Sequence, residues 1–347
     1  MESAPDSVLI IKMSSFGDII CALPTLRALR QHLPRCRIGW VVDERFVRLV
    51  THDPAIDRVF VVPLRRWTEL ARSPASWATL KAETAALRRE LRTDPFDVSL
   101  DLQGILKSGL VARAAGCPRN YQMATDRLGR LRWIFPGVRC APHGEHTVDR
   151  MLPLAAALGA RTTNPCFDVH IPEAARETAA SLLPPDGRLL ALNPTASAPH
   201  RTWPPRRYAA LARRAHRELG LRIVVLGGPG DVEVGSTIAE QADVPVTCTA
   251  GKTDYLELAA VLQRCDLLVS SDTGPQHLAA ALGRPVVALF GPSVPERTGP
   301  YGSNHTVIHH KLPCHPCFSR PTCRTFDCMG AITVDEVFAA VAGKVGG

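Results

Sequence analysis

A polar turn between two apolar segments is the part of this sequence best suited to chemistry. Residues 266–270 form an apolar run that fits a strand buried on both faces, and the turn Ser-Asp-Thr-Gly follows at 271–274. A proline then opens a helix that we expect over residues 276–282. Backbone N–H groups at such a helix start can bind a phosphate, but Asp272 and Thr273 can equally serve as helix caps.

A second carboxylate, Asp18, stands at a similar turn near the start of the chain. We expect a strand over residues 8–12 and a helix from about residue 19 to 32, and Gly17 lets the backbone bend tightly between them. A carboxylate at this place could remove a proton from a hydroxyl acceptor. It could also cap the helix, because Asp stabilises a helix start. The residues alone leave both roles open.

Hydroxyl groups and a guanidinium follow the strand expected at residues 189–193. Thr195, Ser197 and Arg201 lie just after its end, where the carboxyl ends of parallel strands bind ligands. Arginine is always charged and matches phosphate oxygens in shape, so this segment suits a diphosphate. The alternative is a surface loop that leads into the helix expected over residues 205–219.

A glycine-rich loop, Gly-Gly-Pro-Gly-Asp at 227–231, follows another expected strand. It invites comparison with the G-x-G-x-x-G dinucleotide motif, but Glu233 occupies the position of the third glycine. A nicotinamide-dependent dehydrogenase is therefore disfavoured. Asp231 or Glu233 could still contact a ribose or a base.

Polar and basic residues collect in the first half of the chain. Arg65 and Arg66 precede a tryptophan, Gln103 and Lys107 follow the strand expected at residues 97–102, and Arg150 shares a helix face with His146. A cluster of this kind would suit an acidic acceptor. Each residue taken singly fits a solvated surface charge equally well.

Composition limits the class of protein. The chain has 347 residues, of which 46% are hydrophobic and 21% charged, as in a globular protein with room for two cores. No apolar run approaches the roughly 18 residues that span a bilayer, and the start of the chain lacks a secretory pattern, so we expect a cytoplasmic protein. The net charge of +8 suits anionic partners. No nucleic-acid-binding motif is present, so we expect no nucleic acid partner.

Four of the eleven cysteines are concentrated near the end of the chain. Cys314, Cys317, Cys323 and Cys328 form the pattern C-x2-C-x5-C-x4-C. The pattern raises the possibility of a structural zinc or another thiolate-bound centre, although the second pair lacks the usual zinc spacing. Reduced thiols in a loop are the alternative, since a cytoplasmic protein keeps most thiols reduced.

Strands alternate with helices along most of the chain, which predicts parallel sheets with helices on both faces. Prolines interrupt the pattern between about residues 119 and 180, and the sequence PPDG at 184–187 indicates an inter-domain linker. We therefore predict an α/β protein with two Rossmann-like, doubly wound domains that face a central cleft. The expected domains are residues 1–180 and 181–330, and a C-terminal helix at 331–347 could pack back on the first domain.

The motifs together resemble glycosyltransferase family 9, the ADP-heptose:lipopolysaccharide heptosyltransferases. The likeness extends over nearly the whole chain and is carried by these segments, in order: KMSSFGDIICALPTLRAL, WVVDERF, RRW, DLQGILKS, NPTASAPHRTWPPRRYAALA, LGGPGD, AGKT, SSDTGPQHLAAALGRPVVALFGPS and PYG. The resemblance implies a GT-B fold, with an acceptor-binding first domain and a nucleotide-sugar-binding second domain.

The resemblance also implies roles for individual residues. Asp18 matches the proposed general base, and Arg201 stands where the family usually has lysine, so these two are the predicted catalytic residues. The predicted donor-binding residues are Thr195, Ser197, Arg201, Asp231, Glu233, Gly251, Lys252, Thr253, Asp272, Thr273, Gly274 and His277. The predicted acceptor-binding residues are Ser15, Gly17, Arg65, Arg66, Gln103, Lys107 and Arg150. Cys21 departs from the family, in which many members have histidine at this position.

The implied reaction is an inverting transfer of a heptose from ADP-heptose to the lipid A–Kdo inner core of lipopolysaccharide. No D-x-D-type metal site accompanies the phosphate turn, so we expect catalysis without a metal or other cofactor. The implied location is the cytoplasmic face of the inner membrane, with the protein peripherally bound to its anionic surface. The alternatives are a family 9 transferase with another nucleotide sugar or acceptor, and an inactive nucleotide- or metal-binding protein on the same scaffold.

Overall fold

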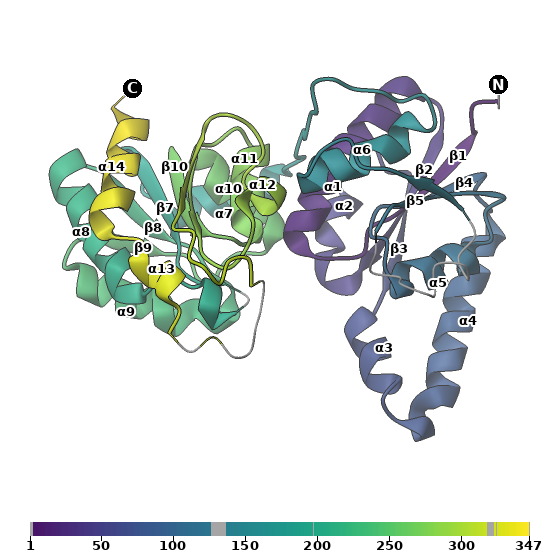
Figure 1. Ribbon diagram of the computed structural model, residues 1–347, viewed down its shortest axis with the longest axis horizontal. Helices are drawn as coiled ribbons and strands as arrows, with labels where there is room; N and C mark the ends of the chain where they lie inside the picture. Colours follow the sequence, from purple (N-terminus) through teal and green to yellow (C-terminus); the bar gives the residue numbers. More distant parts are fainter. Residues whose placement is uncertain (1–2, 126–136, 197, 318–322, 324, 347) are drawn as a thin grey trace. The chain divides into compact units, whose positions relative to one another are not determined.

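The computed structural model describes residues 3–125, 137–196, 198–317, 323 and 325–346 of the chain. Its contacts divide the chain into two units, Met1–His170 and Ile171–Gly347. Each unit is built on a parallel sheet with helices on both faces (Figure 1). This confirms the predicted α/β class with two doubly wound domains.

The sheet of the first unit has the strand order β3-β2-β1-β4-β5-β6 among the described residues. All neighbouring strands are parallel. The five residues of β1 are all buried, because helices cover both faces of the sheet. The strands are β1 (Ser7–Ile11), β2 (Arg37–Asp43), β3 (Arg58–Val62), β4 (Val98–Asp101), β5 (Arg119–Met123) and β6 (Val138–Cys140).

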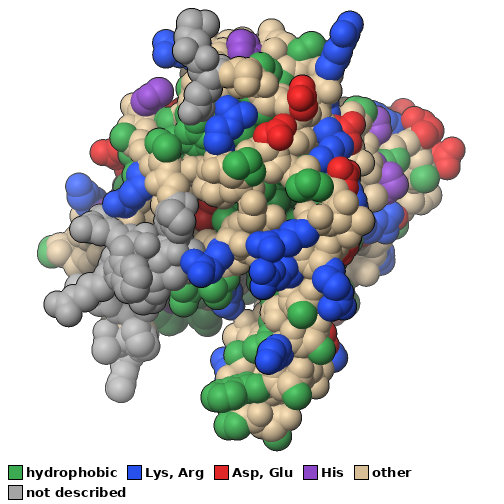
Figure 2. Space-filling model, turned by 90° about the vertical axis from the view of Figure 1, so that its right-hand side faces the viewer, with side chains coloured by type: hydrophobic (Ala, Val, Ile, Leu, Met, Phe, Trp, Pro, Cys, Tyr) green, Lys and Arg blue, Asp and Glu red, His purple; other side chains and the backbone are tan. Residues whose placement is uncertain are grey.

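Helices α1 and α6 pack together on one face of this sheet, and α4 and α5 cover the other (Figure 1). Helices α3 and α4 project from the unit as a hairpin (Figures 1 and 2). The helices of this unit are α1 (Phe16–His32), η1 (Glu44–Phe46), α2 (Arg48–Thr51), α3 (Leu64–Leu70), η2 (Pro74–Ser76), α4 (Trp77–Thr93), α5 (Leu106–Ala115) and α6 (Thr147–Ala156).

The sheet of the second unit has the order β12-β11-β10-β7-β8-β9, again with parallel neighbours throughout its described part. Its two central strands are fully buried, as their apolar sequences predict. The strands are β7 (Leu189–Asn193), β8 (Arg222–Val225), β9 (Val246–Cys248), β10 (Leu267–Ser271), β11 (Val286–Phe290) and β12 (His305–His309).

Helices α8, α9 and α14 pack on one face of the second sheet, while α10 packs against both α7 and α11. The helices of this unit are α7 (Glu173–Leu182), η4 (Pro199–Arg201), α8 (Pro205–Leu219), η5 (Pro229–Asp231), α9 (Val232–Ala242), α10 (Tyr255–Arg264), α11 (Gly274–Ala281), α12 (Pro295–Thr298), α13 (Asp327–Ala331) and α14 (Val334–Val345).

Both sheets have the same strand order when their strands are numbered from the start of each unit, and this order reverses direction once. The reversal lies between β1 and β4 in the first sheet and between β7 and β10 in the second. In open α/β sheets, ligands bind at this switch point, beside the carboxyl ends of the strands. The loops that follow these four strands are therefore where binding residues are expected.

Two boundaries differ from the expectation drawn from the sequence. The chain divides after His170 rather than after residue 180, because α7 packs on α10 of the second unit. Helix α14 packs on α8 and on β10, β11 and β12 of the second unit. Its buried side chains, including Val337, Phe338 and Val341, belong to the core of that unit.

Candidate functional site

The Asp18 turn connects β1 to α1 at the first switch point. Asp18 is the third residue of α1, and its Oδ2 accepts hydrogen bonds from the backbone N–H and the hydroxyl of Ser15 at 3.1 and 3.0 Å. This pair is a capping box, so the helix-cap role of Asp18 is realised. The two hydrogen bonds fix the orientation of a carboxylate at the carboxyl end of the central strand, where a general base would also have to stand.

Cys21 lies one turn further along α1 and is buried. Burial raises the pKa of its thiol, and the nearby negative charge of Asp18 raises it further, while Lys12 acts in the opposite direction. The thiol therefore stays neutral in the physiological range. A histidine at this position could carry a positive charge beside Asp18, and Cys21 cannot.

The loop after β4 braces the Asp18 turn. Gln103 is buried, and its Oε1 accepts the Met13 N–H at 2.9 Å while its Nε2 donates to Ser14 Oγ at 3.1 Å. The buried Asp101 carboxylate holds this loop by accepting the N–H groups of Gln103 and Gly104, both at 2.9 Å. Burial raises the pKa of Asp101, which its hydrogen bonds oppose. Gln103 thus positions the turn in addition to facing the cavity described next.

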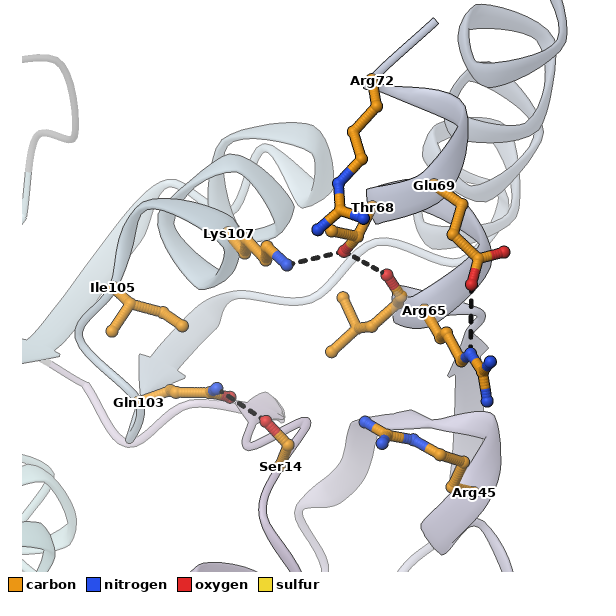
Figure 3. A pocket seen from close by; sticks show the side chains of 10 residues that line it. Ser14, Arg45, Arg65, Thr68, Glu69, Arg72, Gln103, Ile105 and Lys107 are labelled. Atoms are coloured by element: carbon orange, nitrogen blue, oxygen red, sulfur yellow. Dashed lines mark hydrogen bonds and ion pairs between the residues drawn. The ribbon is translucent and has the colours of Figure 1, made fainter. Parts of the chain in front are cut away.

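A cavity of about 390 Å³ opens beside this loop in the first unit (Figure 3). Four of its lining residues are cationic: Arg45, Arg65, Arg72 and Lys107. Ser14, Leu64, Thr68, Glu69, Gln103 and Ile105 complete the lining. Four cations against one carboxylate make the cavity suitable for an anionic ligand.

Neighbouring side chains orient most of these cations. Lys107 donates from Nζ to Thr68 Oγ1 at 2.8 Å, and Arg65 pairs with Glu69 at 3.1 Å (Figure 3). Arg45 donates to both oxygens of the buried Asp43, at 2.7 and 3.2 Å. The cations therefore come from three different elements, η1, α3 and α5, with Arg72 just beyond the end of α3.

Two predicted acceptor-binding arginines do not line this cavity. Arg66 points to α4, where it pairs with Glu83 at 2.7 Å, and this interaction raises the pKa of Arg66. Arg150 donates to the backbone oxygen of Ala124 at 3.3 Å. Among the remaining predicted residues, Ser15 forms the capping box, and Gly17 is buried in the first turn of α1.

The Asp272 turn connects β10 to α11 at the second switch point. Thr273 is the N-cap residue by position, but its side chain makes no capping hydrogen bond. Its Oγ1 instead accepts from Asn193 Nδ2 at 2.9 Å, across the switch point from the end of β7. The side-chain cap considered for Thr273 is therefore absent. Pro275 has no N–H and the Gln276 N–H donates to the Thr273 backbone oxygen at 3.3 Å, so a phosphate at this helix start would rely on the N–H of Gly274.

Asp272 is 8% exposed and holds two neighbours. Its Oδ1 accepts from Gln276 Nε2 at 3.1 Å, and its Oδ2 lies 3.6 Å from the Arg201 guanidinium. At this length the ion pair places Arg201 beside the turn without a tight hydrogen bond. Gly274 begins α11, the partly buried His277 follows in its first turn, and Thr195 lies next to the end of β7. Ser197 lies outside the described residues.

Two further predicted donor loops lie side by side at the ends of β8 and β9. The N–H of Gly251 donates to the oxygen of Gly227 at 3.0 Å. Gly251 has φ +73°, and a Cβ there would come within 2.9 Å of Val232, so the loop needs glycine. Asp231 caps its own turn, since Oδ2 accepts the Gly228 N–H at 2.7 Å. Lys252 is exposed and Thr253 partly exposed on the second of these loops, and Glu233 is exposed in the first turn of α9.

The cysteine tail gives no support to the zinc prediction. Burial raises the pKa of Cys328, a hydrogen bond to the Met329 backbone lowers it, and Cys317, Cys323 and Cys314 raise it further. Residues 318–322 and 324, which connect them, lie outside the described residues. Among the residues that are described, no group of three or more His, Cys, Asp or Glu is arranged to hold a metal ion.

Sequence reasoning missed four residues that the structure brings to these sites: Arg45, Arg72, Asp101 and Asn193. Arg72 lies seven residues after Arg65, which is two turns of helix, and this spacing could have indicated a shared face. Asn193 and Asp101 end central strands, where ligand sites are expected. Arg45 lies in the segment WVVDERF that carries the family resemblance, but no role was predicted for it.

Comparisons with known proteins agree with this geometry. The model of glycosyltransferase family 9 (heptosyltransferase) matches residues 84–325. This chain belongs to glycosyltransferase family 9. It is 30% identical to lipopolysaccharide heptosyltransferase 1 of Pseudomonas aeruginosa, over 91% of this chain and 87% of the relative. It is 32% identical to lipopolysaccharide heptosyltransferase 1 of Escherichia coli K12, over 86% of this chain and 92% of the relative.

A solved structure of a family 9 member gives the same result for the fold. The Escherichia coli heptosyltransferase WaaC with ADP-2-deoxy-2-fluoro heptose superimposes with a TM-score of 0.76 at 26% identity, covering 97% of this chain and 99% of WaaC. The GT-B class expected from the sequence is confirmed. As a family 9 member, the chain is a glycosyltransferase.

Proposed function

We propose that this family 9 enzyme transfers a heptose from ADP-heptose to the lipid A–Kdo inner core of lipopolysaccharide. The observation that carries the proposal is its 32% identity to lipopolysaccharide heptosyltransferase 1 of Escherichia coli K12, with both switch-point carboxylates, Asp18 and Asp272, in place. The related WaaC binds ADP-2-deoxy-2-fluoro heptose, which supports ADP-heptose as the donor.

In the proposed donor site, the diphosphate lies at the start of α11. The N–H at this helix start and the hydroxyl of Thr273 supply hydrogen-bond donors, and Arg201 supplies the positive charge. Asp272 keeps Arg201 near the turn, 3.6 Å away. Thr195, Ser197, Gly274 and His277 complete the phosphate and sugar contacts in this proposal. The paired loops with Asp231, Glu233, Gly251, Lys252 and Thr253 hold the adenosine.

In the proposed reaction, Asp18 removes the proton from the acceptor hydroxyl. The acceptor oxygen then forms a bond to the anomeric carbon as the bond from that carbon to the diphosphate oxygen breaks, so the configuration inverts. The electron pair of the broken bond leaves with ADP. Arg201 and the N–H at the start of α11 stabilise the growing negative charge, which is the step that preorganised donors accelerate.

In the proposed acceptor site, the cationic cavity of the first unit receives the anionic core sugar. Arg45, Arg65, Arg72 and Lys107 line it, and Gln103 and Ser15 fix the turn that carries Asp18. Arg66 and Arg150 remain proposed acceptor contacts from the family resemblance alone. Their present partners are Glu83 and the backbone of Ala124.

We further propose that no metal is required, because Arg201 and the N–H at the start of α11 supply the charge stabilisation in this scheme. The proposed location is the cytoplasmic face of the inner membrane, peripherally bound, with nucleotide sugar and lipid acceptor as partners and no nucleic acid. Among the described residues, no helix has both the length and the apolar character needed to cross a bilayer.

The test is to incubate the purified protein with ADP-heptose and a panel of truncated core lipids, and to measure masses. We expect an increase of one heptose on an acceptor that ends in Kdo. Parallel reactions with other nucleotide sugars check the donor, and a reaction with EDTA checks the metal. Transfer that occurs only with a different sugar donor would overturn the proposal.

A further inference from the structure

The turn between α3 and α4 exposes an unusual density of apolar side chains. In residues 71–78 the exposed apolar residues are Ala71, Pro74, Ala75, Trp77 and Ala78. Trp77 is 58% exposed, and its indole N–H donates to the backbone oxygen of Ala71 at 3.3 Å. This hydrogen bond orients the Trp77 ring at the surface of the tip. Tryptophan with its apolar body exposed is typical of a binding surface.

The hairpin that carries this tip packs on the core of its unit only at its base, through Leu64 of α3 and Leu87 and Leu91 of α4. Figure 1 shows α3 and α4 extending from the sheet, and Figure 2 shows apolar side chains at the end of the projection. In α4 the first buried residue is Leu87, so residues 77–86 have no buried side chain. Glu83 holds the two helices together through Arg66 at 2.7 Å and the Trp67 indole at 2.9 Å. The hairpin therefore presents an apolar end that is exposed and available to a partner.

The charge behind the tip indicates the chemistry of that partner. Residues 64–93 contain seven Lys or Arg and three Glu. Lys81, Arg88 and Arg89 are exposed along α4, and Arg72 is the only charged residue within the tip. An apolar tip with tryptophan and a basic collar matches an anionic bilayer surface, where the apolar part enters the headgroup region and the cations meet the lipid phosphates.

The tip is also connected directly to the cationic cavity. Arg65, Thr68 and Glu69 of α3 line the cavity, as does Arg72 at the tip itself. Seven residues of helix rise only about 10 Å, which is the depth to which an interfacial segment enters a membrane. A tip at the membrane surface would therefore place the cavity at the level of the headgroups.

We propose that residues 71–78 insert into the interface of an anionic membrane and hold the cavity beside the sugar of a lipid-linked acceptor. The location of the acceptor rests on the function proposed above, whereas the membrane contact itself does not. Trp77 provides the apolar anchor, and Lys81 and Arg89 contribute the attraction to anionic lipid. Arg72 belongs to the tip and also lines the cavity.

The test is co-sedimentation of the full chain with vesicles of phosphatidylethanolamine and phosphatidylglycerol, and with vesicles of phosphatidylcholine alone. We expect preferential binding to the anionic vesicles. Trp77→Ser should weaken this binding by roughly tenfold. The double variant Lys81→Glu/Arg89→Glu should remove the preference for anionic lipid. The matched control is Val138→Ser, since Val138 is also 58% exposed but lies on β6, and it should bind as the wild type does.

The fold of each variant is checked by its thermal melting temperature, which should not change because neither Trp77 nor Lys81 is buried. Equal vesicle binding by wild type and Trp77→Ser would overturn the proposal. A change of sedimentation coefficient in Trp77→Ser without a change in vesicle binding would also overturn it, because the tip would then bind a second copy of the chain.

Rates of heptose transfer to a lipid-free and to a vesicle-embedded acceptor distinguish failure of this proposal from failure of the proposed function. Trp77→Ser should transfer normally to a lipid-free Kdo acceptor but more slowly to the same acceptor embedded in vesicles. Equal rates on both acceptors would overturn the docking role and leave the function intact. Absence of transfer by the wild type to both acceptors would overturn the function, while vesicle binding would still report on the tip.

Discussion

The switch points of the two sheets are both bridged by a side-chain amide, but they present side chains of opposite charge. In each, a side-chain amide crosses between the central strands: Gln103 reaches from the β4 loop to the β1 turn, and Asn193 reaches from the end of β7 to the β10 turn. The first turn presents Asp18 at a capped helix start. The second presents an uncapped helix start with Arg201 beside it. Under the function proposed above, the same topology serves proton removal on one sheet and anion binding on the other.

The largest effect should come from the carboxylate of the first turn. Asp18→Asn should lower kcat for heptose transfer by about 10²- to 10⁴-fold, because a positioned general base contributes that much. ADP affinity, measured by calorimetry, should not change, since Asp18 belongs to the acceptor side. If the variant keeps its turnover, Asp18 is only a cap.

The second unit offers a matched control for the cap. Thr333 and Glu336 form the same capping box at the start of α14, with hydrogen bonds of 2.8 to 3.2 Å. Glu336→Ala and Asp18→Ala should each cost roughly 0.3–1.5 kcal/mol of unfolding free energy for the lost capping box, and Glu336→Ala also removes the pair with His310 at 2.9 Å. Only Asp18→Ala should lose transfer. Equal loss of activity in both variants would mean that helix stability, and not proton removal, is at stake.

The next largest effect concerns the cation of the second turn. Arg201→Ala should lower kcat/KM by about 10²- to 10³-fold, as does removal of a donor that stabilises developing negative charge. Arg201→Lys should recover part of this loss, because charge remains while the planar geometry is lost. The measurement is steady-state kinetics with ADP-heptose varied. If Arg201→Ala has normal kinetics, Arg201 does not stabilise the leaving diphosphate.

The two amide braces should differ in their effect on stability. Gln103→Ala leaves the Met13 N–H buried without its acceptor, which costs about 1–3 kcal/mol. Asn193→Ala should lower the free energy of unfolding by less. The hydroxyl oxygens of Ser270 and Thr273, both partners of Asn193, lie 3.2 Å apart and keep a hydrogen bond to each other. Urea unfolding measures both. ADP affinity should weaken only in Asn193→Ala. Weaker ADP binding in Gln103→Ala alone would contradict the proposal that the donor binds to the second unit.

The smallest effect is the acid response of the second sheet. Burial lowers the pKa of His305 on β12, so the unfolded chain takes up the proton first. His305 therefore costs no stability above its ordinary value of 6.5, and stability is lost as pH falls below it. His305→Gln should flatten this acid-side slope in urea unfolding measured between pH 7 and 5. His52→Gln, at an exposed position, is the control and should leave the slope unchanged.

The sequence predicted most of the helices and strands, because parallel strands that are buried on both faces have short, continuous apolar sequences. The runs at 8–12 and 266–270 correspond to β1 and β10, and the helix expected at 205–219 has those bounds. The boundary of the first unit was harder to predict. Helix α7 lies where prolines interrupt the pattern and was assigned mostly to the first domain, and only its packing on α10 assigns it to the second unit.

The sequence by itself determined the family, the two carboxylate turns and their place after central strands, since local residue types and spacing encode a strand-turn-helix unit. Tertiary structure decided what those turns do. It placed Asp18 in a capping box, turned Thr273 away from its helix toward Asn193, and drew Arg66 to Glu83. It also gathered Arg45, Arg65, Arg72 and Lys107 around one cavity. Residues from separate elements meet only when the sheet is assembled, so no local pattern could have brought them together.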